Sequence, residues 1–116
     1  MSVFILIKDP NTQKIGCLIQ SQKESILEFS TIKEAQSKWQ NIQFSKYDIS
    51  KKELFEKAFL CFYEPRVVET DTMYLINNIH SIQKSECPLF IIRNVVFSDI
   101  VGQELWNNSV PLNGKW

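Results

Sequence analysis

The stretch FSTIKEAQSKW, residues 29–39, joins the end of a strand-like run to the start of an amphipathic helix. Thr31 and Glu34 have the spacing of a capping box, in which the hydroxyl accepts from an early helical amide and the carboxylate reaches back to the cap. Apolar residues then recur at spacings of three, four and three, which places them on one helical face: Ile32, Ala35, Trp39 and Ile42. The stretch therefore predicts a helix that packs this face against a sheet.

The residues before this helix predict the sheet. Residues 3–7, VFILI, are uninterrupted and rich in strand formers, as expected for a strand that is covered on both faces. Residues 15–20 and 25–29 predict a second and a third strand. Turn formers at residues 9–11 separate the first two strands, and the short connections favour an antiparallel meander.

A second helix is predicted after residue 50. Ser50 and Glu53 form another capping box, and Pro65 ends the segment because the residue before proline avoids the helical region. The apolar residues between them repeat at helical spacing: Leu54, Phe55, Ala58, Phe59 and Phe62.

Residues 72–84 fit two structures. A helix capped at Thr70 or Asp71 would carry Leu75, Ile76, Ile79 and Ile82 on one face. A hairpin that turns at Asn77 and Asn78 would also account for the segment. The apolar spacing favours the helix, and both alternatives stay open.

The C-terminal part begins with the longest strand-like run, residues 89–97, which we expect to join the N-terminal sheet beside the first strand. Asp99 starts a short helix through Trp106, and residues 107–116 form an extended tail. The chain is thus one α+β domain, 1–116. It has a mostly antiparallel sheet of about four strands, in the order β-β-β-α-α-α-β-α, with helices packed on one face.

Composition excludes several classes of protein. The 116 residues contain 13 basic and 13 acidic side chains, without the basic surplus of a dedicated nucleic-acid binder. Cys17, Cys61 and Cys87 are scattered, which indicates reduced thiols in a cytoplasmic protein. No apolar run reaches the length of a membrane span, so we expect no membrane partner.

No residue set predicts catalysis, a metal or a cofactor. Three isolated glycines cannot build a phosphate-binding loop. His80 is the only histidine, it has no second ligand at metal-site spacing, and it is expected to cap or border a helix. Cys17 and Cys61 lie inside apolar runs, where buried thiols are inert. Glu53 and Glu56 alternate with lysines, as on a solvated helix face.

The remaining hypothesis is a small protein-binding module, acting as an inhibitor, an adaptor or a complex subunit. The candidate residues lie in or near the tail, where full burial is hard to arrange: Trp106, Val110, Leu112 and Trp116. Equally, the tail could fold back and seal one end of the sheet. A free edge at residues 27–29 or 89–97 would offer a second route, the addition of a partner's strand, and a homodimer is one form of such a complex.

The alternative is a weak nucleic-acid-binding domain that uses a lysine face around residues 46–57: Lys46, Tyr47, Lys51, Lys52 and Lys57. The FSTxxEAxxxW pattern also resembles the strand-to-helix junction of the β-β-β-α arm domains of tyrosine recombinases, over about a tenth of the chain. Those domains bind DNA through a basic sheet, whereas the first strand here is apolar. The chain is therefore not assigned to that family.

Overall fold

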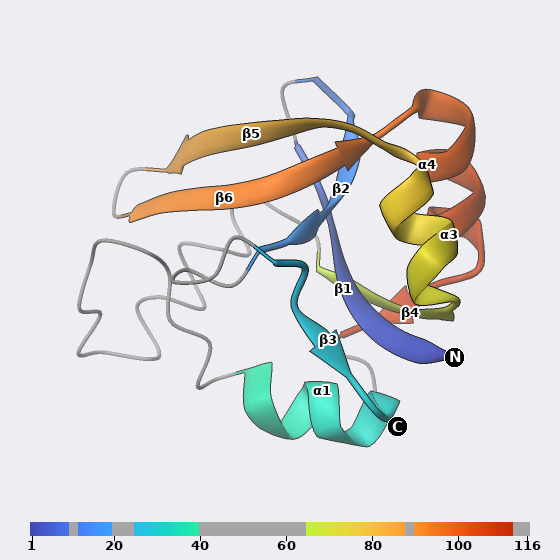
Figure 1. Ribbon diagram of the computed structural model, residues 1–116. Coiled ribbons are helices and arrows are strands. Elements are labelled where there is room, and N and C mark those ends of the chain that lie inside the picture. The colour runs from blue at the N-terminus through green and yellow to red at the C-terminus, as the bar shows by residue number, and fades with distance from the viewer. Residues whose placement is uncertain (10–11, 20–24, 40–64, 88–89, 113–116) are drawn as a thin grey trace.

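The computed structural model describes residues 1–9, 12–19, 25–39, 65–87 and 90–112 (Figure 1). The N-terminal elements are β1 (Ser2–Lys8), β2 (Ile15–Leu18), β3 (Glu28–Phe29) and α1 (Ile32–Trp39). The C-terminal elements are β4 (Arg66–Thr70), α3 (Thr72–Asn77), β5 (Ile79–Cys87), β6 (Phe90–Phe97), α4 (Asp99–Asn107) and β7 (Val110–Pro111). The α+β class is confirmed, and the helix predicted after residue 50 lies outside the described residues.

The described strands form one antiparallel sheet of seven, in place of the about four strands expected. Its order is β5-β6-β2-β1-β4-β7, and β3 pairs with β1. β6 lies beside β2, with Cys17 opposite Val95, so the prediction that it lies beside the first strand is wrong. β1 is already paired along both edges and has no place for it.

β2 and β3 lie end to end along one edge of β1, and β4 occupies the other edge. Leu6 pairs with Cys17 of β2, and Phe4 pairs with Glu28 of β3. The expected meander of three adjacent strands is therefore wrong. The chain instead leaves the edge of β1 after Leu18 and returns at Leu27, whose amide donates to the Leu18 carbonyl at 3.0 Å.

The segment 72–84 is half helix and half strand, so neither alternative is right as it stands. The Asp71 carboxylate accepts from the Met73 amide at 3.0 Å and caps the start of α3. At the other end the Asn78 amide donates to the Leu75 carbonyl at 3.1 Å, and its side chain donates to the Tyr74 carbonyl. β5 begins at the next residue, Ile79.

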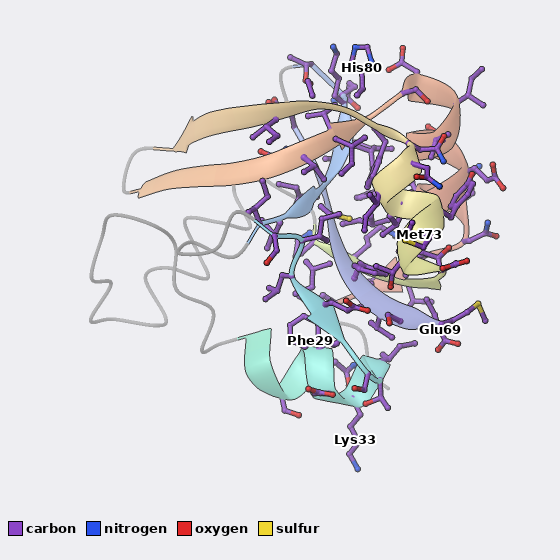
Figure 2. The ribbon with its side chains drawn as sticks, viewed as in Figure 1. Phe29, Lys33, Glu69, Met73 and His80 are labelled. Carbon is purple, nitrogen blue, oxygen red and sulfur yellow. The ribbon has the colours of Figure 1, made fainter. Side chains whose placement is uncertain are left out.

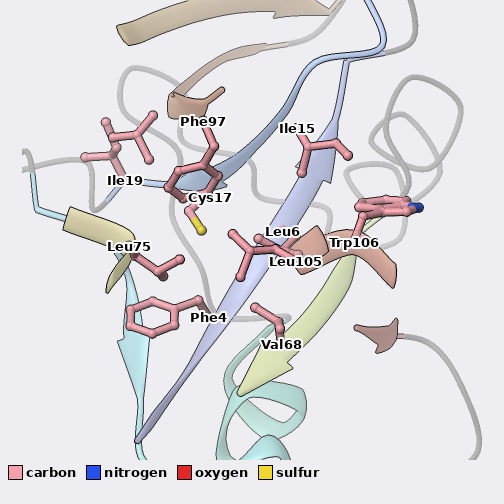
Figure 3. Close-up of a cluster of buried hydrophobic side chains, with 11 residues drawn as sticks. Phe4, Leu6, Ile15, Cys17, Ile19, Val68, Leu75, Phe97, Leu105 and Trp106 are labelled. Carbon is pink, nitrogen blue, oxygen red and sulfur yellow. The ribbon is translucent and has the colours of Figure 1, made fainter. Parts of the chain in front are cut away.

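Both faces of β1 are buried, which confirms the prediction for residues 3–7. Phe4 and Leu6 belong to a cluster that receives Leu75 from α3 and Leu105 from α4 (Figure 3). Val3, Ile5 and Ile7 alternate with them, so they are on the opposite face, and they too are buried.

If all helices packed on one face of the sheet, as the sequence predicts, they would contribute to one hydrophobic cluster. The three described helices do not. α3 and α4 lie together, whereas α1 stands apart from them and contacts β1, β3 and β4 (Figure 1). Its Ala35 is completely buried. The cap predicted at Thr31 is confirmed, because the Glu34 amide donates to the Thr31 hydroxyl at 3.1 Å. The Glu34 carboxylate accepts from the Ser30 amide at 3.1 Å, one residue before the predicted cap residue.

Candidate protein-binding surface

The tail residues predicted to bind a partner are mostly buried where the structure describes them. Trp106 is only 9% exposed and Leu112 is buried, whereas Val110 is exposed. Trp116 lies outside the described residues. In this conformation Val110 alone of the three described positions offers apolar surface, and a binding role for the group stays a prediction.

Trp106 is held at the end of α4 by two cations. The Lys8 ammonium lies 4.5 Å and the Arg66 guanidinium 5.2 Å from the centre of its ring. Both distances are within the range of cation–π attraction. The ring is thus enclosed by side chains from β1 and β4, neither of which is near it in the sequence.

The chain after α4 folds back on the sheet as far as Leu112. β7 pairs with β4, with Val110 opposite Val67, and the Leu112 amide donates to the Pro65 carbonyl at 3.2 Å. Of the two alternatives for the tail, the described part therefore takes the second and closes one end of the sheet.

The lysine face of the nucleic-acid alternative, residues 46–57, lies outside the described residues. Of the described lysines near the sheet, Lys8 lies on the Trp106 ring and Lys14 is exposed.

Exposed apolar side chains lie on the side of the sheet that carries α3 and α4. Met73 and Ile76 on α3 are exposed, and Ile100 at the start of α4 is 83% exposed. Ile82 on β5 is 56% exposed and pairs with the buried Val95, so it is on the same side of the sheet as the two helices. We call these four residues the α3–β5 surface; Figure 2 labels Met73 on α3.

A hydrogen bond between Tyr74 and Glu104 joins the two helices. The tyrosine hydroxyl donates to the Glu104 carboxylate at 3.4 Å. Partial loss of solvent raises the pKa of Tyr74, and the neighbouring carboxylate raises it further. α3 ends where β5 begins and α4 begins where β6 ends, and Ile79 of β5 pairs with Phe97 of β6. Ile76 and Ile100 therefore lie at the same end of the helix pair.

β5 forms one edge of the sheet. Eight of its nine residues pair with β6, and no other described strand pairs with it. The register shifts by one residue between Ile79 and Ser81, so His80 is the extra residue of a β-bulge. His80 is exposed and follows α3 by three residues, in a strand and not at a helix cap (Figure 2).

The sequence suggested a free edge at residues 27–29 or 89–97, and neither of these corresponds to β5. Residues 90–97 form β6, which lies inside the sheet between β5 and β2. Glu28 and Phe29 pair with β1 over only two residues. The edge was missed because residues 79–84 were read as part of a helix or a hairpin.

Cys17 is fully buried, and burial raises the pKa of its thiol far above the usual range. Among the described residues, no cluster of three histidine, cysteine or acidic side chains could hold a metal. Asn94 is buried with its carbonyl oxygen unpaired, beside the close contact of β2 and β6 at Gly16.

Among the described residues, no helix has the length and apolar character needed to cross a membrane. No protein family, curated protein or solved structure matches the chain significantly.

Proposed function

We propose that this protein works by binding another protein, as an inhibitor, an adaptor or a complex subunit, through the α3–β5 surface and the edge of β5. One observation carries the proposal: a nine-residue strand lies at the edge of the sheet beside four exposed apolar side chains. The location thus differs from the tail residues expected from the sequence, because Trp106 and Leu112 are buried in the core.

A strand edge and an apolar surface recognise a partner in complementary ways. The outward amides and carbonyls of an edge strand form a ladder with any extended segment, which contributes affinity without selecting a sequence. Side chains on the same face add selectivity, because alternate residues of the added segment would pack against Ile82 and the helices.

The apolar side chains are large enough to matter energetically. Full burial of an isoleucine contributes about 1.5–3 kcal/mol relative to leaving it exposed. The exposed fractions of Ile82 and Ile100 leave much of this free energy available to a partner.

The experiment is an affinity capture from host lysate, with and without nuclease, that compares the wild type with Ile82→Glu and Val110→Glu. Both substitutions place a charge on an exposed apolar position of an edge strand, at opposite ends of the sheet. We expect one protein to be captured in stoichiometric amount, to survive nuclease, to be lost with Ile82→Glu and to be kept with Val110→Glu.

Other outcomes point elsewhere. Loss with Val110→Glu alone would move the binding surface to the tail, as the sequence predicted. Capture that disappears with nuclease would reject protein binding and support the nucleic-acid alternative.

A further inference from the structure

The register of β5 on β6 places two basic residues in opposite positions. Lys84 of β5 is the pairing partner of Arg93 of β6. Like charges in directly opposite positions of two antiparallel strands destabilise the pair. A carboxylate opposite Lys84 on the free edge of β5 would offset this repulsion, and a strand that adds to the edge could supply it.

β5 itself carries a carboxylate at the spacing that such a strand needs. Glu86 follows Lys84 by two positions, and the register on β6 is regular from Ser81 to the end of β5, so Ile82, Lys84 and Glu86 occupy the same face of the strand. Two copies of β5 can pair antiparallel about a two-fold axis perpendicular to the sheet. Such an axis leaves each residue on its own face, so one residue must lie opposite its own copy.

The residue on the axis decides which charges meet. With Lys84 or Glu86 on the axis, like charges would oppose each other, and with Gln83 there, each lysine would oppose the apolar Ile82 of the other copy. With Ile82 on the axis, the bulge at the start of β5 would enter the ladder and interrupt it. With Ser85 on the axis, Lys84 of each copy lies opposite Glu86 of the other.

We propose that the strand that adds to β5 is β5 of a second copy of this chain, paired antiparallel with Ser85 on the two-fold axis. This inference rests on the proposed function for the position of the interface. Residues 83–87 of both copies form the ladder, with pairs of Lys84 and Glu86 on both sides of the axis. Ile82 is then diagonal to Glu86 of the other copy, and the two sheets join into one with both pairs of α3 and α4 on the same side.

Single charge reversals test the arrangement by sedimentation velocity of the purified full chain, from about 1 μM to about 1 mM. The wild type should pass from monomer to dimer in this range. Lys84→Glu places a carboxylate opposite Glu86 of the other copy, and Glu86→Lys places an ammonium opposite Lys84. Each should therefore weaken the association at least about tenfold. Thermal unfolding checks that both variants are folded; within the monomer, Lys84→Glu relieves the like-charge pair with Arg93.

Mixing the two variants separates pairing of charges from a structural role of either residue. One variant has carboxylates at positions 84 and 86 and the other has ammonium groups there, so each repels its own copies and attracts the other. We expect the equimolar mixture to form heterodimers about as tightly as the wild type forms homodimers. A chain that carries Lys84→Glu and Glu86→Lys together should regain self-association for the same reason.

The matched controls make the same reversals elsewhere. Lys33→Glu lies on α1 and Glu69→Lys lies on β4, and both positions are exposed (Figure 2). β4 is separated from β5 by β6, β2 and β1 in the sheet, and α1 contacts β1, β3 and β4. Both controls should keep the dissociation constant of the dimer within about twofold.

The proposal is overturned if the wild type stays monomeric over the whole range, if the mixed variants do not associate, or if a control weakens the dimer as much as the variant that it matches. A monomeric wild type that captures a different protein and loses it with Ile82→Glu would reject the second copy and leave the proposed function standing. A chain that neither self-associates nor captures a partner would reject both.

Discussion

Arg66 donates hydrogen bonds to both the side-chain hydroxyl and the backbone carbonyl of Ser109. Its Nε donates to the Ser109 hydroxyl at 2.6 Å, and its Nη2 donates to the Ser109 carbonyl at 2.7 Å. The bonds join β4 to the chain after α4, 43 positions later. The same guanidinium lies on the Trp106 ring, so one side chain positions both the end of α4 and the turn that follows it.

Arg66→Lys should destabilise the protein although it keeps the charge. A lysine cannot make the planar, two-bond contact, and loss of hydrogen bonds to a charged group costs about 1.5–3 kcal/mol. Urea unfolding followed by circular dichroism measures the change. Ser109→Ala, which keeps the carbonyl acceptor, should cost less; equal stability of wild type and Arg66→Lys would show that the contact contributes nothing.

Gly16→Ala should be severely destabilising. A Cβ at this position would lie 1.8 Å from the Val95 carbonyl oxygen, so β2 and β6 would have to separate. We expect a loss of at least about 3 kcal/mol in the free energy of unfolding. The matched control is Gly102→Ala, where the nearest atom is Cβ of Ile15 at 3.2 Å. Alanine has a higher helix propensity than glycine, by about 1 kcal/mol, and this gain offsets part of the cost of the crowding. A tolerated Gly16→Ala would contradict the register of β2 and β6.

Thr31→Ala should cost about 1 kcal/mol, because it leaves an amide at the start of α1 without its acceptor. Ser37→Ala on the same helix serves as the control. The Ser37 hydroxyl donates to the Lys33 carbonyl at 2.7 Å, a bond that a helix does not need, so its loss should leave stability unchanged or slightly raised. If chemical denaturation showed that Ser37→Ala costs more stability than Thr31→Ala, this result would argue against Thr31 as the cap.

The carboxyl group of Glu28 predicts a pH dependence of stability. Hydrogen bonds from the Ser2 and Thr72 hydroxyls lower the pKa of Glu28 from its ordinary value of 4.5, and the N-terminal charge contributes in the same direction. Because the folded pKa is the lower one, the stabilisation is fully present above the ordinary value. It is lost as the pH falls through the folded pKa.

Thr72→Val removes one of these donors at 2.9 Å. It should raise the pKa of Glu28 toward its ordinary value, which carbon-detected NMR of the carboxyl group measures. The difference in free energy of unfolding between wild type and variant should shrink as the solution is acidified. A difference that grows with acidification would have the wrong sign for this contact.

Short sequence patterns correctly predicted the features that depend mainly on neighbouring residues. The buried strand at residues 3–7, the cap at Thr31 and the helix from Asp99 are all present. β4 was missed because RVVET has only two adjacent apolar residues, and its pairing with β1 depends on residues more than sixty positions away. Such long-range pairing leaves no local pattern.

The misreading of residues 72–84 has a specific cause. Ile79 and Ile82 are three residues apart, which is a helical spacing. In the structure both lie on one face of the strand, since Ile79 pairs with Phe97 and Ile82 with Val95. The bulge at His80 inserts one residue between them and so gives a strand the spacing of a helix.

The burial of Trp106 could not be read from the sequence for a related reason. Trp106 lies close to the tail in sequence, but Lys8 and Arg66 reach it from two strands that only the folded sheet brings together. The α3–β5 surface likewise needs the sheet order before Ile82 and the helices can be placed on the same side.

The sheet order also has a kinetic consequence. The hairpins β1–β2 and β5–β6 connect neighbours in the chain and can form early, on the microsecond scale typical of hairpins. Joining them requires Gly16 to meet Val96, so the entropy of closing a loop of more than half the chain opposes this step. We expect this closure to limit the folding rate, which places folding in the millisecond-to-second range of proteins dominated by distant contacts. Until it happens, the apolar residues of both hairpins remain exposed, and folding competes with aggregation.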